Sequence, residues 1–362
     1  MKKVTIIFGI LCATLFSCSH GDSYYSPDEI LVDERVECVD SVILKNVKEL
    51  SSVVVGLYSI DHYLILVQNN RDSVLQVVDM NNGSFLASFG KIGRAKTEFQ
   101  SVPQKVYCIR DKNGNPMLCI QENACTKIVD IKKSICANTC VISKIIKEKK
   151  DYLFDYTYHL GEQECFNYKT VSYEDARDEV YIEPKFYMED SDEKWEIFPQ
   201  IITPAFSNIV DCAYAMMVYV SPNGKHAVGI QNLIDMVTIF DIVNNKSIGI
   251  INSASYTLEY LEKEVNENNI KDELIWYNTS GGVTDNGFVV IKDGDFYRKV
   301  AYEEGEDGPS IINYYNWNGE KQFSYLVNKK LKYIAYNEKE EILYAISNAD
   351  KLYSCKLKKN EK

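Results

Sequence analysis

The feature that most constrains the fold is a repeated unit of about 50 residues. Each unit has an alternating strand, a turn, an apolar strand that ends in an acid or amide, a Gly or Asn turn and another strand. The clearest copies are residues 64–89, 106–131, 227–250 and 311–326. A four-stranded sheet of this size cannot bury both faces alone, so such units must stack on one another. The repeat length is typical of a β-propeller blade.

The number and limits of the blades follow from this spacing. The abundance of Tyr (26 residues) and the scarcity of long helical periodicities favour an all-β domain over residues 30–358. We predict a six-bladed β-propeller, with seven blades as the alternative. Residues 36–44 are expected to complete the last blade, beside strands at 331–336, 342–346 and 352–357. Leu258, Leu261 and Val265 share a helical face, which predicts a short helical insert near 257–275.

The N-terminus has the pattern of a bacterial lipoprotein signal peptide. Lys2 and Lys3 precede an apolar run that ends in Leu15-Phe16-Ser17-Cys18, and a small residue before a cysteine is the cleavage signal for lipidation. The run is too short to cross a bilayer as a helix. We therefore expect a signal peptide over 1–17, an acylated Cys18 as the first mature residue, and a tether over 18–29. The predicted location is the bacterial cell envelope, at the outer membrane, with the lipid membrane as the first partner.

The net charge excludes nucleic acid as a partner. It is −12 for the whole chain and becomes −14 once Lys2 and Lys3 leave with the signal peptide. Nucleic-acid affinity depends mostly on clustered basic residues that neutralise phosphates, and this chain carries the opposite field.

The cysteines suggest one candidate disulfide and no metal site. Eleven cysteines become nine once Cys12 is removed and Cys18 is acylated. If Asn113-Gly114 is a two-residue hairpin turn, Cys108 lies opposite Cys119 at a distance that a disulfide tolerates; two small core residues facing each other are the alternative. The spacings of Cys125, Cys136 and Cys140 are not those of a zinc site. No metal or other cofactor is expected.

Two groups of side chains could serve a binding or catalytic site. Asp61-His62, with His226, is the best acid–base candidate by residue type, and Asp61-His62 is expected in a turn because neighbouring strand residues point to opposite faces. The aromatic candidates could stack on sugars or peptides, or could simply pack between blades; they are Tyr314, Tyr315, Trp317, Trp276 and Tyr277. No nucleophile elbow, zinc-protease motif or phosphate loop occurs.

Three segments resemble known propellers. Residues 89–99 are similar to the blade-to-blade crossover of NHL-type and TolB-like six-bladed propellers, in which glycines and an aromatic set the turn. Ser221-Pro222-Asn223-Gly224-Lys225 resembles the S-P-D-G-K turn of TolB-type blades, and residues 311–346 resemble the last blades of the BF3164-like lipoproteins. Ala95-Lys96 departs from the usual Gly-Pro. The resemblance implies a TolB-like propeller in the bacterial envelope, and it brings no catalytic residues.

These observations favour a binding or scaffold module for a protein, peptide or glycan over an enzyme, since propellers present loops on a rigid ring. One alternative is an envelope glycan hydrolase or lyase that uses axial carboxylates and a His. A structural subunit of an envelope complex is the other. A His and two or more acids gathered in a concave axial pocket would favour the enzyme, whereas a large apolar rim patch would favour a protein partner.

Overall fold

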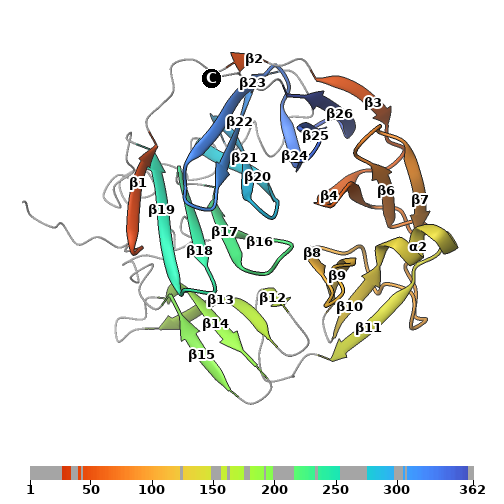
Figure 1. Ribbon diagram of the computed structural model, residues 1–362, viewed down its shortest axis with the longest axis horizontal. Coiled ribbons are helices and arrows are strands. Elements are labelled where there is room, and N and C mark those ends of the chain that lie inside the picture. Colours follow the sequence, from red (N-terminus) through yellow and green to blue (C-terminus); the bar gives the residue numbers. More distant parts are fainter. Residues whose placement is uncertain are drawn as a thin grey trace, which may run out of the picture.

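The computed structural model describes residues 27–33, 40–41, 44–122, 125–147, 156–160, 164–174, 180–190, 193–198, 216–232, 235–252, 275–296, 305 and 308–357. These residues form six sheets arranged in a ring around a central axis (Figure 1). The predicted six-bladed β-propeller is therefore confirmed. Cys18 and the signal peptide lie outside the described residues, as does most of the predicted helical insert, of which residue 275 begins a strand.

The first three blades follow one another along the chain, each with its strands in sequence order from the axis outward. Blade 1 contains β4 (Val54–Ile60), β5 (Tyr63–Gln68), β6 (Leu75–Asp79) and β7 (Phe85–Phe89). Blade 2 contains β8 (Lys105–Arg110), β9 (Pro116–Glu122), β10 (Cys125–Asp130) and β11 (Ile142–Lys147). Blade 3 contains β12 (Tyr156–His159), β13 (Cys165–Glu174), β14 (Val180–Glu189) and β15 (Lys194–Ile197).

The other three blades each include a strand from the N-terminal part of the chain. Blade 4 contains β16 (Met216–Val220), β17 (His226–Gln231), β18 (Met236–Asp241), β19 (Lys246–Asn252) and β1 (Glu29–Asp33). Blade 5 contains β20 (Ile275–Val283), β21 (Gly287–Phe296), β22 (Ser310–Asn316), β23 (Lys321–Val327) and β2 (Asp40–Ser41). Blade 6 contains β24 (Leu331–Asn337), β25 (Ile342–Ser347), β26 (Lys351–Lys356) and β3 (Lys45–Glu49).

The N-terminal part of the chain passes along the outer edges of blades 4, 5 and 6 (Figure 1). β1 and β2 add parallel to β19 and β23, and β3 then pairs antiparallel with β26. The expectation that an N-terminal strand completes the last blade is confirmed. Its predicted position at 36–44 is wrong, because the closing strand is Lys45–Glu49. Closure by both ends of the chain leaves no open blade.

Many of the hairpins turn at an Asp or Asn followed by a glycine. Asp79, Asp111 and Asn316 each accept, at the side-chain oxygen, a hydrogen bond from the backbone N–H two residues ahead, at 2.9, 2.8 and 3.0 Å. A glycine with positive φ closes the Asp111 turn, Gly114 at φ 76°. Such residues are favoured because Asx side chains replace backbone partners and glycine adopts positive φ without strain.

The Asp111 turn overturns the expected pairing of Cys108 with Cys119. Arg110 lies opposite Pro116, so the register is displaced by one residue and Cys108 faces Leu118. A one-residue shift places a side chain on the opposite face of the sheet. Cys108 accordingly packs between blades 1 and 2, whereas Cys119 packs between blades 2 and 3. Both thiols are free, and burial raises the pKa of Cys119 to about 12.

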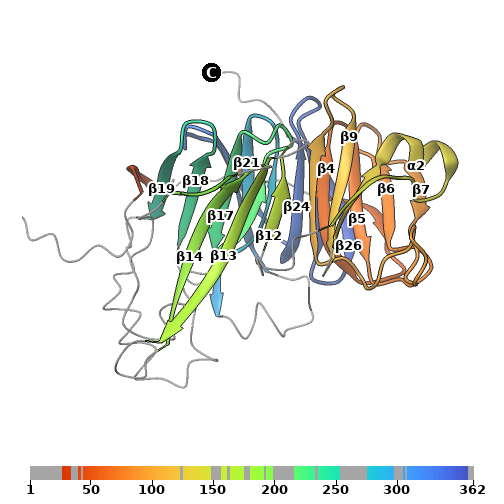
Figure 2. The same cartoon turned by 90° about the horizontal axis from the view of Figure 1, so that it is seen from below.

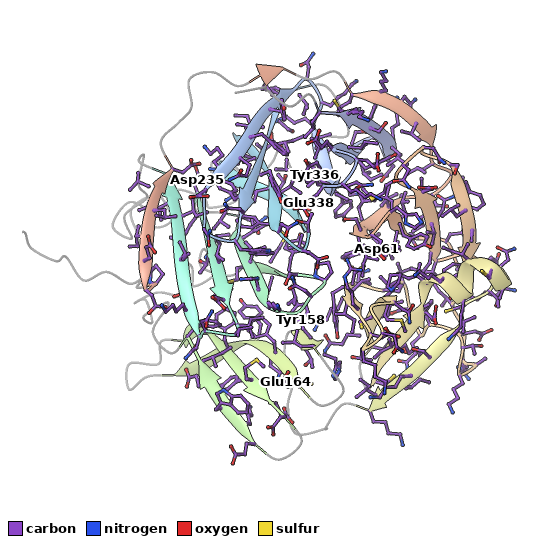
Figure 3. All side chains as sticks on the ribbon, in the orientation of Figure 1. Asp61, Tyr158, Glu164, Asp235, Tyr336 and Glu338 are labelled. Carbon is purple, nitrogen blue, oxygen red and sulfur yellow. The ribbon has the colours of Figure 1, made fainter. Side chains whose placement is uncertain are left out.

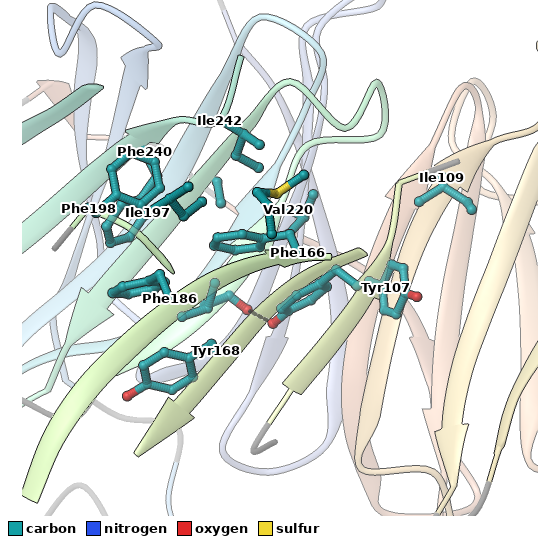
Figure 4. Packing of buried hydrophobic residues seen from close by; sticks show 14 of the residues in the cluster. Tyr107, Ile109, Phe166, Tyr168, Phe186, Ile197, Phe198, Val220, Phe240 and Ile242 are labelled. Carbon is teal, nitrogen blue, oxygen red and sulfur yellow. Dashed lines mark hydrogen bonds between the residues drawn. The ribbon is translucent and has the colours of Figure 1, made fainter. Parts of the chain in front are cut away.

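Apolar side chains from adjacent blades fill the spaces between them. Blade 3 contributes Phe186 and blade 4 contributes Phe240, whose ring centroids are 4.5 Å apart (Figure 4). Tyr158 of blade 3 also donates a hydrogen bond to the Val218 carbonyl of blade 4 at 2.6 Å. Each large side chain buried in this way contributes about 1.5–3 kcal/mol. Stability thus comes from contacts between blades as well as from strand pairing.

The crossover from blade 1 to blade 2 uses the predicted glycine and aromatic. Phe99 is fully buried, and a Cβ at Gly90 would lie 2.7 Å from its ring, so only glycine fits. The short helix α2 (Ile131–Ala137), which the sequence did not predict, follows β10 on the outside of the ring (Figure 2). No helix in the described part combines the length and apolar character that crossing a membrane requires.

Candidate functional site

The turns that follow the innermost strands of blades 1, 2, 4, 5 and 6 lie at one end of the axis, which we call the mouth. Turns from blades 1, 2, 4, 5 and 6 surround a cavity of about 410 Å³ there. Figure 3 shows Asp61 of blade 1 and Tyr336 and Glu338 of blade 6 at the inner edge of the ring. The lining residues are Ser59, Ile60, Asp61, His62, Asn81, Arg110, Lys132, Pro222, Val283, Thr284, Asp285, Tyr336, Asn337, Glu338 and Lys339.

Arg110 joins blades from both sides of the mouth. Its Nη1 pairs with Asp61 of blade 1, and its Nη2 lies 2.7 Å from Asp285 Oδ2 of blade 5, which is opposite blade 2 in a ring of six. Its backbone N–H donates to the Pro222 carbonyl of blade 4 at 3.1 Å. A guanidinium can hold two carboxylates because its donors are planar and fixed in direction. One residue therefore connects four blades, three through its side chain and the fourth through its backbone.

Glu338 forms a second connection, between blades 5 and 6. Its Oε1 accepts hydrogen bonds from Thr284 Oγ1 at 2.6 Å and from the Tyr314 hydroxyl, and its Oε2 accepts from Asn286 Nδ2 at 2.9 Å. Burial and the bond to Glu338 raise the pKa of Tyr314. The phenol therefore stays protonated and donates. The carboxylate of Glu338 is held in place before any ligand arrives.

Trp317 supports the Asp285 turn from behind. Its indole Nε1 donates to the Asp285 carbonyl at 3.1 Å, and Asn223 of blade 4 donates to the same oxygen at 3.3 Å. His226 stacks on the indole, with ring centroids 4.9 Å apart and an interplanar angle of 8°. The Asp285 side chain keeps one buried oxygen, Oδ1, without a hydrogen-bond partner. Hydrogen bonds to the Asp285 backbone carbonyl thus fix the turn, and one oxygen of the Asp285 carboxylate accepts no hydrogen bond.

The axis narrows sharply below the mouth. The next cavity along it holds only about 30 Å³, room for about one water, and is lined mostly by apolar residues of the innermost strands. Gly281 and Gly282 of β20 permit this closeness, since a Cβ at Gly282 would lie 2.6 Å from the Ile334 carbonyl oxygen of blade 6. The mouth is therefore a polar pocket with an apolar, nearly closed base.

The structure separates the predicted acid–base residues. Asp61 and His62 occupy the β4–β5 turn, as expected, and both line the mouth. His226 does not line the cavity, because its ring packs on Trp317. Among the described residues, no group of three or more His, Cys, Asp or Glu is arranged to hold a metal ion.

The predicted aromatic candidates are part of the framework. Tyr314, Tyr315 and Trp317 are 8%, 1% and 8% exposed. They therefore pack in the protein interior and are not positioned to stack on a ligand. Tyr315 instead donates to Asp33 Oδ2 at 2.8 Å. The side chains of Trp276 and Tyr277 lie outside the described residues, although their backbone belongs to β20.

Sequence reasoning missed several residues of the mouth: Arg110, Lys132, Asp285, Glu338 and Lys339. One signal was available, because each of Asp61, Asp285 and Glu338 follows the end of an innermost strand by one or two positions. Aligning the blades on those strand ends would have selected them. The distance between blades in the sequence hides the contacts, since Arg110 and Asp285 are 175 positions apart.

Comparison with known proteins shows the fold alone. No protein-family model and no curated protein matches this sequence. A Bacteroides fragilis protein described as exported has a similar structure, with a TM-score of 0.51 and 14% identity over 91% of this chain and 100% of its own. A member of the DUF4221 family from Bacteroides vulgatus has a TM-score of 0.53 and 11% identity, covering 88% of this chain and 98% of that one. This chain is therefore similar in fold to two Bacteroides proteins.

Proposed function

We propose that this protein is a binding module of the bacterial cell envelope and that the mouth binds a polar ligand, the end of a glycan or of a peptide. The observation that carries the proposal is a 410 Å³ cavity lined by five blades, in which charged side chains from four of them are already held by ion pairs and hydrogen bonds. Its volume lies within the range of small-molecule sites, about 300–1,000 Å³. Side chains that need no rearrangement lose little entropy on binding.

The exposed charged groups of the mouth indicate where a ligand would bind. Asp61 and Asp285 are paired with Arg110, and Glu338 accepts three hydrogen bonds. Lys132 and Lys339 are exposed and line the same cavity. These two ammonium groups can donate hydrogen bonds to the hydroxyl, carbonyl or carboxylate oxygens of a ligand.

Substitution of these lysines tests the proposal. We expect Lys132→Ala and Lys339→Ala together to weaken binding of a ligand identified on glycan and peptide arrays by at least about tenfold, since each lost charged contact is worth about 1 kcal/mol or more. Titration calorimetry would measure this. Lys144→Ala, an equally exposed lysine on β11, is the matched control. A ligand that binds the double variant as tightly as the wild type would place the binding site elsewhere.

The proposal includes a lipid anchor at Cys18 and membership of the BF3164-like, TolB-like lipoproteins. It is supported by the signal pattern and by the fold shared with a protein described as exported. The chain enters at the mouth end of blade 4, where Asp28 Oδ2 accepts from the Ser247 N–H at 2.7 Å. Cys18 and Asp28 are ten positions apart, a stretch that spans at most about 36 Å. An acylated Cys18 would hold this edge close to the membrane.

Two cysteine variants test the anchor. Cys18→Ser should release the protein from the membrane fraction and abolish incorporation of labelled fatty acid. Cys12→Ser, in the apolar part of the same signal peptide, should leave both unchanged. Membrane association that persists in Cys18→Ser would contradict the anchor.

An envelope glycan hydrolase or lyase is the second candidate, and one observation favours it. His62 and three carboxylates, those of Asp61, Asp285 and Glu338, share one concave axial cavity. Binding is preferred because the carboxylates are occupied by Arg110 and by neutral donors that fix the blades. Release of reducing ends from a bound glycan, lost in both Asp61→Asn and His62→Asn, would establish the enzyme instead.

A further inference from the structure

The hairpin between β12 and β13 brings a thiol and an imidazole together outside the mouth. His159 ends β12 and Cys165 begins β13, and the two residues are paired in the antiparallel register. Their side chains share one face of blade 3, with Cys165 Sγ 3.0 Å from His159 Nδ1. Figure 3 labels Glu164, the residue before Cys165, in this blade. Neither side chain lines the mouth, so the proposed function leaves the pair unexplained.

The surroundings fix the backbone of the hairpin, bury His159 and leave Cys165 partly exposed. His159 is only 5% exposed, and its backbone N–H donates to the Tyr107 hydroxyl of blade 2 at 2.7 Å. The Leu160 N–H donates to the Glu164 carbonyl at 2.9 Å and closes the hairpin. Cys165 is partly exposed and is not in a disulfide. A buried base beside an accessible thiol is the arrangement that activates a cysteine.

Other described cysteines have different surroundings from Cys165. Cys108 and Cys119 are buried in apolar surroundings, and burial raises the pKa of both thiols. Cys136 is exposed on α2. Cys165 differs from these cysteines because it is partly exposed and contacts the imidazole of His159.

We propose that Cys165 and His159 form a reactive thiolate–imidazolium pair, a modification site for small disulfides and soft carbon electrophiles. The proton moves from Cys165 Sγ to His159 Nδ1, which leaves a thiolate. With a disulfide R–S–S–R, the thiolate forms a bond to one sulfur while the S–S bond breaks, and the second sulfur departs as a thiolate that takes the proton from the imidazolium. The products are a mixed disulfide at Cys165 and one thiol, with no net change in the number of disulfides.

Alkylation of the full chain with iodoacetamide, followed residue by residue by mass spectrometry, tests the proposal. At pH 6 we expect Cys165 to react at least about tenfold faster than Cys136, although Cys136 is the more exposed, because an ordinary thiol is almost entirely protonated at that pH. Between pH 6 and 8 the rate at Cys165 should rise much less steeply than the rate at Cys136. Oxidised glutathione should form its mixed disulfide at Cys165 before Cys136.

Two variants separate the activated thiol from an accessible one. His159→Asn should lower the rate at Cys165 at pH 6 by about tenfold or more and leave Cys136 unchanged. His226→Asn, which removes an imidazole of blade 4 that does not line the mouth, should alter neither rate. Because His159→Asn could disturb the hairpin, the pH profile of the wild-type protein is the independent test. A Cys165 rate at pH 6 no greater than that of Cys136, with the same slope up to pH 8, would overturn the proposal.

Discussion

At the scale of the residue, Arg110 stabilises the mouth by holding turns of different blades together. Its guanidinium pairs with Asp61 of blade 1 and Asp285 of blade 5, two turn residues whose carboxylates would otherwise repel each other. All three side chains are about one-third exposed, so water weakens each pair. The planar geometry of the guanidinium, which a lysine lacks, allows both contacts at once.

Arg110→Ala should lower the free energy of unfolding by about 1–2 kcal/mol, the range for charged hydrogen bonds after allowance for partial exposure. Urea denaturation would measure the loss. Arg71→Ala serves as the control: Arg71 is exposed, its backbone carbonyl accepts from the Ile92 N–H, and the substitution should change the value by less than about 0.5 kcal/mol. Equal effects of the two substitutions would contradict the bridging role.

His226 makes the stability depend on pH. Burial lowers its pKa below the ordinary value of 6.5, an effect that Asp241 partly offsets, and its buried Nδ1 has no hydrogen-bond partner. A lowered pKa means that the unfolded chain binds the proton more tightly. The stabilisation is therefore present above about pH 6.5 and is lost as the pH falls from there through the folded-state pKa. His226→Phe should reduce the decline in urea midpoint between pH 7.5 and pH 5; an unchanged decline would show that other groups cause it.

At the scale of the element, the position of β1 depends on a buried carboxylate, that of Asp33. β1 inserts Asp33 between blades 4 and 5, where the carboxylate lies 2.5 Å from Lys321 Nζ and accepts from Tyr315. Lys292 lies between Asp33, at 3.8 Å, and Asp235, at 2.7 Å. The side chains of these charged residues are only 11–16% exposed. Charges so far from water must be paired, so β1 completes the blade interface.

Asp33→Asn should destabilise the protein by about 1–3 kcal/mol, because it leaves two buried ammonium groups with one carboxylate. Glu29→Gln changes an exposed carboxylate on the same strand and should have almost no effect. The difference between the two urea midpoints is the measurement. Similar midpoints would mean that β1 does not depend on this ion cluster.

α2 begins at a side-chain cap. Asp130 Oδ1 accepts from the Lys133 N–H at 2.9 Å, and Asn138 ends the helix in a left-handed conformation. Asp130→Ala should cost about 1 kcal/mol, the usual value of an N-cap. Asp130→Asn retains the acceptor and removes only the exposed Lys133 pair, so thermal unfolding should show a much smaller change. Equal losses would assign the effect to the ion pair.

At the scale of the whole molecule, ring closure joins distant parts of the chain. Blade 6 takes three strands from the C-terminal region and β3 from the N-terminal region, and the blade 6–blade 1 interface contains Met80, Ala335 and Tyr344. Tyr344 donates to the Met80 carbonyl at 2.8 Å across it. Loss of β3 would expose an edge strand and one side of this core.

Two truncations test closure. A chain that begins at residue 27 keeps β1–β3 and should unfold in calorimetry as the longer protein does. A chain that begins at residue 51 lacks all three strands, and we expect it to melt at a lower temperature and to aggregate through the uncovered edge of β26. Equal melting temperatures for the two truncations would show that closure contributes little.

The sequence alone determined the fold class, because period-two alternation and the 50-residue spacing are local properties of the chain. It also located the turns at Asp61-His62, Ser221–Lys225 and Trp317–Gly319, since turn residues act within a few positions. It misplaced the closing strand and the Cys108–Cys119 register. The closing strand depends on partners far away in the chain. The register depends on a side-chain hydrogen bond, that of Asp111 with the Asn113 N–H, which changes the length of the loop by one residue.

Only the tertiary structure decided which side chains make the mouth. Arg110, Asp285 and Glu338 carry no local pattern, and they meet because closure of the ring brings the turns of five blades to one end of the axis. The same closure buried Tyr314, Tyr315 and Trp317 between blades. Alternation in a strand shows which residues share a face of the sheet. Which residues of other blades contact that face depends on how neighbouring sheets pack.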